Sequence, residues 1–124
     1  MWALGDGDVP DMPDNDASLD SVRAIALSYP GVEERTTARG TSFRAGGRIM
    51  ACEAVHKSAE PNSLMVCMDP EHRTALISAE PETYYVTAHY AKYPACLVRL
   101  STLNLDSLGK VLGAAWEFAR EEAR

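Results

Sequence analysis

Hydrophobic positions recur at helical spacing near both ends of the chain, which predicts a helix at each end. The first predicted helix begins at about Ser18, a residue type that caps helix N-termini, and ends at Pro30-Gly31. For the last helix, Asp106 is the predicted N-cap, and the apolar stripe is Leu108, Val111, Leu112, Ala115, Trp116 and Ala119. We therefore expect Trp116 to lie in the core.

Short segments of alternating polarity between these helices are typical of β-strands. Six strands are predicted, at 33–37, 41–45, 48–55, 64–68, 83–86 and 95–100. A further helix begins at Asp69-Pro70-Glu71 and ends at about Ala79. The predicted order is α-β4-α-β2-α. Because short turns join consecutive strands, it favours an α+β fold with an antiparallel sheet and helices packed on one face.

Charge is distributed unevenly along the chain, whose formal net charge is −6. Five of the 18 acidic residues lie in the first sixteen positions, which hold no Lys or Arg. Residues 1–15 lack a hydrophobic period and are predicted to be a flexible acidic leader, native or appended, before a single domain over 16–124. From Arg35 to Lys57, by contrast, five basic residues face one acidic residue. This segregation indicates an anionic partner more clearly than the total charge does.

The sequence shows no sign of export or membrane insertion. No apolar run approaches the ~20 residues that cross a bilayer, and the first residues lack a basic segment followed by an apolar one. The cysteines Cys52, Cys67 and Cys96 lie far apart in apolar runs, which favours buried thiols in a reducing compartment. We expect a cytoplasmic protein without membrane contact.

Common catalytic and cofactor motifs are absent from the sequence. It contains no G-x-S-x-G, GxxxxGK or GxGxxG segment, and Glu33-Glu34 would lie on opposite faces of a strand. The histidines His56, His72 and His89 lack the spacing of metal ligands. The sequence therefore predicts no enzyme, no metal site and no cofactor, and favours a binding protein.

Four blocks of the sequence resemble the MmcQ/YjbR family. The first, ALSYPGVEE, is similar to that family's ALSLPGVEE, and the second, FRAGGRI, is similar to its FRVGGKIF hairpin. In the family order, the blocks are Ala26–Glu34, Phe43–Ile49, Asp69–Arg73 with Glu80–Thr87, and His89–Pro94 with Leu97–Leu100. The resemblance covers essentially residues 18–120.

This resemblance implies a CyaY-like fold, in which a curved antiparallel sheet packs against its helices. It also implies DNA binding by a double wing of paired hairpins, and it brings no catalytic residues. The chain departs from the family pattern at Ala95-Cys96, where many relatives carry Gly-Trp or His-Trp. If that tryptophan stacks on bases in the relatives, its absence weakens the case for nucleic-acid binding here.

The basic segment supplies the predicted nucleic-acid-binding site. Side chains alternate along a strand, so Arg35, Thr37 and Arg39 would share one face, and a Gly-Gly turn would let Arg44 and Arg48 project from a hairpin tip. The full predicted site is Arg35, Arg39, Arg44, Arg48, Lys57, His89, Lys92 and Arg99. The expected partner is DNA, bound weakly, at about 10⁻⁴ to 10⁻⁶ M in physiological salt. The alternative is a solvated sheet face whose arginines pair with Glu33, Glu34 and Glu53.

A second functional hypothesis places a protein-interaction or small-ligand site in the loop Tyr84–Tyr93. Four tyrosines gather there, and an exposed ring beside Lys92 would stack on a base or bind a protein partner. Alternation predicts that one of Tyr84 and Tyr85 is buried and the other exposed. The simpler interpretation is that these rings pack in the core and anchor the loop.

Overall fold

Three α-helices and six antiparallel strands make up the computed structural model, which describes residues 17–122. In chain order the elements are α1 (Leu19–Ala26), β1 (Val32–Thr37), β2 (Gly40–Ala45), β3 (Arg48–Glu53), β4 (Ser63–Cys67), α2 (Pro70–Ala79), β5 (Tyr84–Tyr85), the 3-10 helix η1 (Tyr90–Lys92), β6 (Ala95–Arg99), the 3-10 helix η2 (Leu100–Thr102) and α3 (Leu105–Glu122). The predicted α+β class with an antiparallel sheet is confirmed. The predicted acidic leader, residues 1–15, lies outside the described residues, as do positions 16, 123 and 124.

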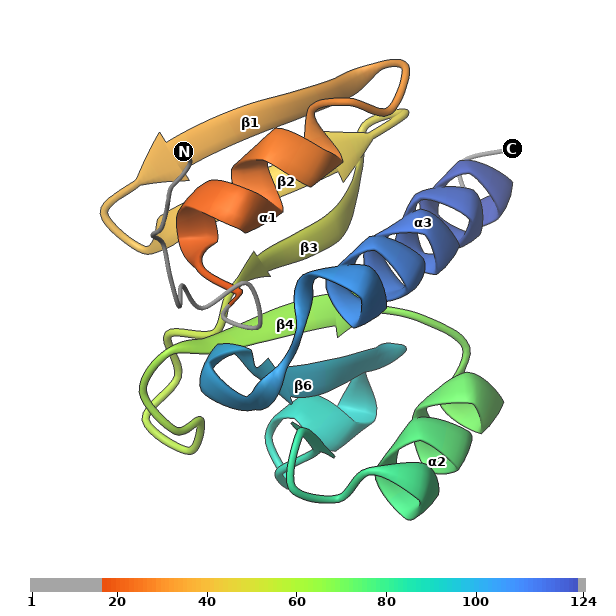
Figure 1. Ribbon diagram of the computed structural model, residues 1–124. Coiled ribbons are helices and arrows are strands. Elements are labelled where there is room, and N and C mark those ends of the chain that lie inside the picture. The colour runs from red at the N-terminus through yellow and green to blue at the C-terminus, as the bar shows by residue number, and fades with distance from the viewer. Residues whose placement is uncertain (1–16, 123–124) are drawn as a thin grey trace, which may run out of the picture.

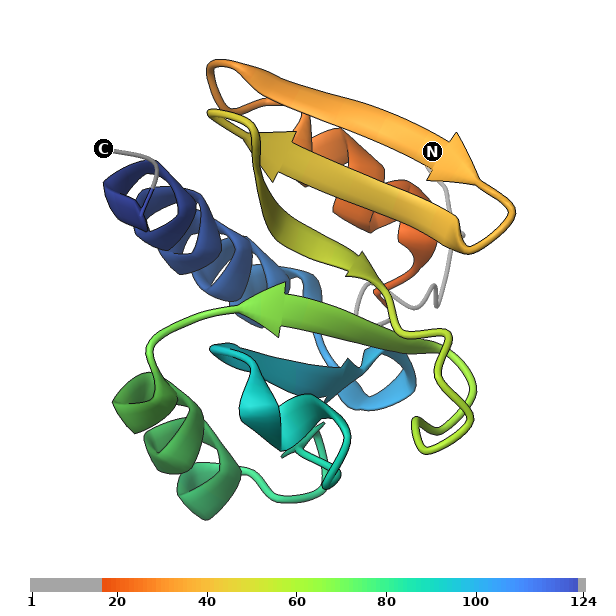
Figure 2. The same ribbon diagram turned by 180° about the vertical axis from the view of Figure 1, so that it is seen from behind.

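The strands lie in the order β1-β2-β3-β4-β6-β5, and every neighbouring pair is antiparallel. Figure 1 shows α1 and α3 on one face of the sheet, while α2 packs at the β6-β5 end. Figure 2 shows the opposite face, where no α-helix of residues 17–122 covers β1 to β4 and the η1 segment lies over β6. We call this second face the open face.

Alternating side chains along the strands separate the core from the open face. In β2, Phe43 and Ala45 are buried toward the helices, while Ser42 and Arg44 point to the other side. Fully buried side chains of the core include Phe43, Met50, Leu64, Val66, Leu108 and Leu112. The helix-covered face therefore carries the hydrophobic burial that stabilises the fold, and the open face keeps its polar groups.

A β-bulge bends the middle of the sheet. Phe43 pairs with Ala51 and Arg44 pairs with Ile49, so Met50 is an extra residue in β3. Met50 and Ala51 are both fully buried on the helix side, whereas Ile49 and Cys52 are half-buried on the open face. Figure 2 shows the bend of β3, which curls the open face into a concave surface.

The predicted N-caps Ser18 and Asp69 are confirmed. The Ser21 backbone N–H donates to the Ser18 hydroxyl at 3.3 Å, and the Glu71 N–H donates to Asp69 at 2.9 Å. The predicted end of the first helix at Pro30-Gly31 is wrong, because α1 ends at Ala26. There the backbone tightens into i→i+3 hydrogen bonds, which turn the Tyr29 ring toward α3.

The N-terminus of α3 also differs from the prediction. Asn104, not Asp106, caps the helix, since its side chain accepts from the Ser107 N–H at 2.8 Å. Asp106 lies in the first turn and pairs with Lys110 at 3.3 Å. Trp116, predicted to be core, is half-buried at the core's edge, where its ring stacks on Tyr29 and its indole N–H donates to the Pro30 carbonyl at 3.1 Å.

The strands are shorter than expected at two places. β3 ends at Glu53 and leaves Val55 exposed, and β5 holds only two residues of the predicted 83–86. All three cysteines are free, but only Cys96 is fully buried as predicted. Cys52 and Cys67 are half-buried because they point to the open face rather than to the core. No helix within residues 17–122 is both long and apolar enough to span a bilayer.

Candidate nucleic-acid interface

A groove of about 640 Å³ runs across the open face between the hairpin turns and the η1 segment. We call it the open groove, and its lining residues are Arg39, Gly47, Arg48, Ile49, Cys52, Met65, Cys67, His89, Tyr90, Tyr93 and Pro94. Arg39 comes from the β1-β2 turn, and Arg48 begins β3 directly after the β2-β3 turn. The aromatic residues of the groove come from the loop before β6. The sheet order brings these distant segments together.

The floor of the open groove is apolar. Cys52 pairs with Met65 across β3 and β4, and Cys67 is the next residue of β4 on the same face. Ile49 continues this floor toward the β2-β3 turn because of the bulge. Sequence alternation alone identified these residues as strand positions and not as a site, because it does not show which face stays uncovered.

Aromatic residues of the η1 segment form the wall. Tyr90 is 6% exposed, and its hydroxyl accepts a hydrogen bond from the His56 backbone N–H at 3.1 Å. The rings of His56 and His89 stack with centroids 3.5 Å apart and planes only 4° apart. Tyr93 is 47% exposed, and its ring lies 6.0 Å from that of His89. The wall is thus a packed aromatic cluster with one accessible ring.

Hydrogen bonds hold the imidazole of His56 in place. The Ser58 N–H donates to His56 Nδ1 at 3.1 Å, and the Ser58 hydroxyl lies 2.8 Å from that of Thr87. His56 Nδ1 therefore accepts a hydrogen bond from the backbone. Desolvation lowers the pKa of His89, and the nearby His56 and Lys92 lower that pKa further. The surroundings of His89 consequently disfavour its charged form.

The thiols on the floor are chemically quiet. Burial raises the pKa of both Cys52 and Cys67 to about 11, with Glu53 adding to the shift for Cys52 and Cys52 adding to it for Cys67. A thiol with such a pKa is protonated at neutral pH and is a poor nucleophile. These residues provide an apolar surface in the open groove.

Arg39 and Arg48 lie at the rim of the open groove. β1 ends at Thr37, so Arg39 lies not in the strand but in the turn, where its N–H donates to the Thr37 hydroxyl at 3.0 Å. Arg35, Thr37 and Arg39 still line one cleft on the same side of the sheet, as predicted. The turn position carries Arg39 over the concave side of the sheet. No acidic residue occurs among the described residues that line the open groove.

A smaller cleft of about 390 Å³ adjoins the open groove along β1 and β2, and we call it the side cleft. It is lined in part by Arg35, Arg39, Arg44 and Glu53. The Glu53 carboxylate accepts from the Thr41 N–H at 2.8 Å. In the register, Glu33 also lies opposite Arg44 on this face. The side cleft therefore mixes both signs of charge, unlike the open groove.

Arg44 does not project from the hairpin tip as predicted. Gly46 and Gly47 have φ of 63° and 84°, which makes a tight two-residue turn, and Arg44 folds back onto it. One guanidinium nitrogen donates to the Gly47 carbonyl at 3.2 Å, and the Arg44 Nε atom is buried with no protein partner in the described structure. Arg44 therefore supports the turn that presents Arg48.

Three further predicted site residues lie outside the open groove. Arg99 forms two hydrogen bonds with Glu60, at 2.7 and 2.8 Å, and its guanidinium stacks 4.1 Å from the centroid of the Tyr85 ring. The pKa of Glu60 is lowered by this pairing. Lys57 lies in the exposed turn after β3, and Lys92 is exposed on η1. Of the late-loop residues in the prediction, the structure brings only His89 to Arg39 and Arg48.

The predicted pairing of the arginines with Glu34 is not what the structure shows. Glu34 points to the helix side, where it accepts from Arg23 of α1 at 2.9 Å. The prediction for the tyrosines holds in part: Tyr84 is buried, and the Tyr85 hydroxyl is 2.6 Å from that of Ser63. Sequence reasoning did not separate exposed Tyr93 from buried Tyr90, because both lie outside a regular strand.

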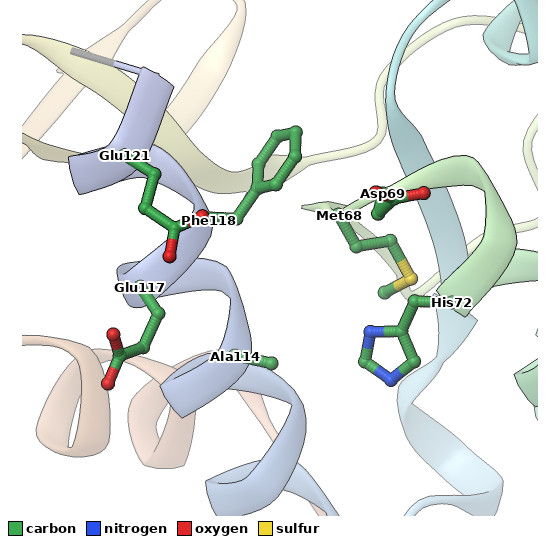
Figure 3. A pocket seen from close by; sticks show the side chains of 7 residues that line it. All are labelled: Met68, Asp69, His72, Ala114, Glu117, Phe118 and Glu121. Carbon is green, nitrogen blue, oxygen red and sulfur yellow. The ribbon is translucent and has the colours of Figure 1, made fainter. Parts of the chain in front are cut away.

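A second recess lies between α2 and α3, on the other side of the molecule (Figure 3). It measures about 380 Å³ and is lined by Met68, Asp69, His72, Ala114, Glu117, Phe118 and Glu121. Figure 3 shows Glu117 pointing away from His72, and no three potential metal ligands converge anywhere in residues 17–122. Its acidic rim disfavours anions and it offers no metal centre, so the open groove is the better candidate site.

Comparison with known proteins establishes relatives for this chain. No family model matches the sequence. The uncharacterized protein Rv2570 of Mycobacterium tuberculosis is 43% identical over 114 residues, which covers 81% of this chain and 86% of the relative. The uncharacterized protein Mb2600 of Mycobacterium bovis matches to the same extent. The chain belongs to the family of these mycobacterial proteins.

Among solved structures, the fold is similar to that of protein DR2400 of Deinococcus radiodurans, a DUF419 domain. The TM-score is 0.67, and the likeness covers 86% of this chain and 88% of the other at 21% identity. At that identity the similarity shows a shared fold. Both comparisons extend over most of the described sheet and helices.

Proposed function

We propose that this protein binds the phosphate backbone of DNA at the open groove and has no catalytic role. The proposal includes membership of the MmcQ/YjbR group and a CyaY-like fold, which the four sequence blocks and the similarity to a DUF419 structure support. The charge of the site supports the binding function, and the lack of a reactive side chain in the groove supports the non-catalytic role.

The observation that carries the proposal is that basic residues and no acids occur among the described residues that line the open groove. The whole chain has a net charge of −6, yet the described residues lining the open groove include Arg39, Arg48 and His89 and no acid. A phosphate at the rim would meet guanidinium groups, whose planar fork matches phosphate oxygens. Glu34 pairs with Arg23 on the helix side of the sheet, and Glu53 lines the adjoining side cleft, where it accepts from the Thr41 N–H.

The number of available contacts sets the strength of binding. Arg39 and Arg48 at the rim, with Arg35 in the side cleft and Lys92 nearby, allow two to four phosphate contacts. Each contact contributes about −0.9 to the slope of log K against log salt concentration, so a slope of about −2 to −4 is expected. Binding of this kind is weak, at about 10⁻⁴ to 10⁻⁶ M, and independent of sequence.

Fluorescence anisotropy with a labelled duplex tests the proposal. At about 50 mM salt the protein is expected to bind at micromolar concentrations and to lose affinity steeply as salt rises. The double variant Arg39→Glu with Arg48→Glu should lower the affinity at least about ten-fold, because both rim cations become anions. Circular dichroism melting of the variant checks that the fold is retained.

The matched control reverses two charges away from the groove. Lys110 and Arg120 lie exposed on α3, on the opposite face of the sheet. The variant Lys110→Glu with Arg120→Glu changes the net charge by the same amount as the groove variant. It should bind DNA like the wild type, apart from a small long-range electrostatic effect on the affinity. Absence of binding near 100 µM protein, salt-insensitive binding, or equal losses in both variants would defeat the proposal.

A protein-interaction surface has weaker support. Among residues 17–122, the exposed large hydrophobic residues are Leu27, Val55, Tyr93 and Leu105. They lie on separate elements, whereas interaction sites present contiguous apolar patches. Tyr90, on which that hypothesis depended, is buried and holds the His56 backbone, so it is a structural residue.

A further inference from the structure

We propose that the open groove takes an unstacked base of single-stranded nucleic acid, so that the preferred ligand is a single strand rather than a duplex. This inference rests on the proposed backbone binding and specifies its ligand. It follows from a feature that phosphate contacts do not require, namely an apolar floor beneath the basic rim.

The shape of the groove argues against a duplex as its best occupant. A duplex presents its phosphates outermost and keeps its bases stacked inside, so a flat or convex basic surface is sufficient to bind it. Here Ile49, Met65 and the two thiols form a recessed floor that outermost phosphates would leave unused. A flipped-out or unpaired base has the apolar faces that fit such a floor.

The size of the groove fits this occupant. Its volume of about 640 Å³ lies in the range of roughly 300–1,000 Å³ in which proteins bind small organic groups. A base with its sugar is a group of that class. The neighbouring phosphates would then extend along the rim toward Arg39 and Arg48.

Tyr93 provides the stacking surface. Its side chain is 47% exposed at the groove, while Tyr90 behind it is buried. Stacking of a base on an aromatic side chain typically strengthens binding by about ten-fold or more, and it tolerates any base.

The backbone that carries Tyr93 is held rigidly. Its N–H donates to the Tyr90 carbonyl at 3.0 Å, and its own carbonyl accepts from Arg73 of α2 at 3.1 Å and from the Ala95 N–H at 2.8 Å. Arg73 also bonds the Ala95 carbonyl at 3.0 Å, which ties the loop to β6. The ring is therefore in position before the ligand arrives, which lowers the entropy cost of stacking.

Competing anisotropy titrations with three ligands test the inference at about 50 mM salt. The ligands are an oligothymidylate of about 12 nucleotides, a duplex of the same length, and thymidine monophosphate. We expect the single strand to bind at least about ten-fold more tightly than either of the others. If the duplex binds as tightly as the single strand or more tightly, the inference is overturned and the proposed function still holds. If none of the three ligands binds, both the inference and the proposed function are wrong.

Variants of Tyr93 separate stacking from backbone contacts. Tyr93→Ala should weaken single-strand binding about ten-fold and leave duplex binding nearly unchanged, because only the unpaired base meets the ring. Tyr93→Phe keeps the ring and should bind like the wild type. Leu105→Ala, an exposed apolar truncation on α3, is the control. Unchanged single-strand binding by Tyr93→Ala overturns the inference, as does monophosphate binding that equals that of the strand.

Discussion

At the scale of single residues, the stack of His56 on His89 is the most distinctive contact of the molecule. Two imidazoles 3.5 Å apart cannot both carry a charge without strong repulsion, and Lys92 adds a third positive group nearby. The hydrogen bond from the Ser58 N–H to His56 Nδ1 holds the partner ring in the stack. We therefore expect the stability of the loop that forms the groove wall to depend on pH.

The sign of that dependence follows from the lowered pKa of His89. The unfolded chain binds a proton on this residue at about pH 6.5, while the folded chain resists it to a lower pH. Stability is thus full above about pH 6.5 and decreases as the pH falls from there toward the folded-state pKa. Thermal melts between about pH 8 and pH 5 should show a falling midpoint.

The variant His89→Phe keeps an aromatic ring on His56 and cannot be protonated. It should flatten the decrease of the melting midpoint at low pH, whereas His72→Gln, on α2 and outside the stack, should leave the decrease as in the wild type. If His89→Phe melts with the same pH dependence as the wild type, the stack is not the pH-sensitive element.

At the scale of elements, α3 offers a matched pair of glycines within one helix. A Cβ at Gly109 would meet no neighbouring atom within 4 Å, whereas a Cβ at Gly113 would lie 2.8 Å from the Tyr29 hydroxyl. Glycine in a helix interior costs about 0.5–1 kcal/mol relative to alanine. Gly109→Ala should therefore raise the free energy of unfolding by about that amount.

Gly113→Ala should lose this gain, because the new methyl group displaces Tyr29 and its stack on Trp116, whose centroids are 5.2 Å apart. Urea denaturation of the two variants measures the difference. Equal stabilisation by both substitutions would show that Tyr29 moves without cost and that the α1–α3 contact is loose.

The elements themselves were largely predictable from the sequence because their signals are local. Ser18 and Asp69 cap their helices through bonds to backbone groups two or three residues away, and Gly46-Gly47 marks its turn by composition. One error was a choice between two local caps, since Asn104 and not Asp106 accepts from the Ser107 N–H at the start of α3. Another error arose where a distant contact decides, because α1 ends early where Tyr29 turns to stack on Trp116 of α3.

The candidate site was predictable only in part, for the same reason. The basic composition of the hairpins pointed to Arg39 and Arg48, but Cys52 and Met65 became groove floor only once the helices had covered the other face of the sheet. The sequence assigned Arg99 to the site because its partner, Glu60, lies 39 residues away along the chain and could not be foreseen. A periodic pattern identifies a strand face and leaves its neighbours unspecified.

At the scale of the whole molecule, the fold separates two tasks between the faces of one sheet. One face of the sheet is covered by α1 and α3 and buries the hydrophobic core (Figures 1 and 2). The other face carries the open groove, whose lining includes basic residues. Outside the first sixteen residues the chain holds 13 acids and 12 bases, a near balance. Attraction to an anion therefore depends on where the charges lie and not on their total.

The central claim, that the open face is where nucleic acid binds, is tested most directly by mapping the contact surface. Titration of the ¹⁵N-labelled protein with DNA should shift the backbone amide signals of the 38–40 turn, of 47–49 and of 89–93. The signals of α1 and α3, on the covered face, should remain in place. Shifts confined to those helices, or spread evenly over the chain, would contradict the account.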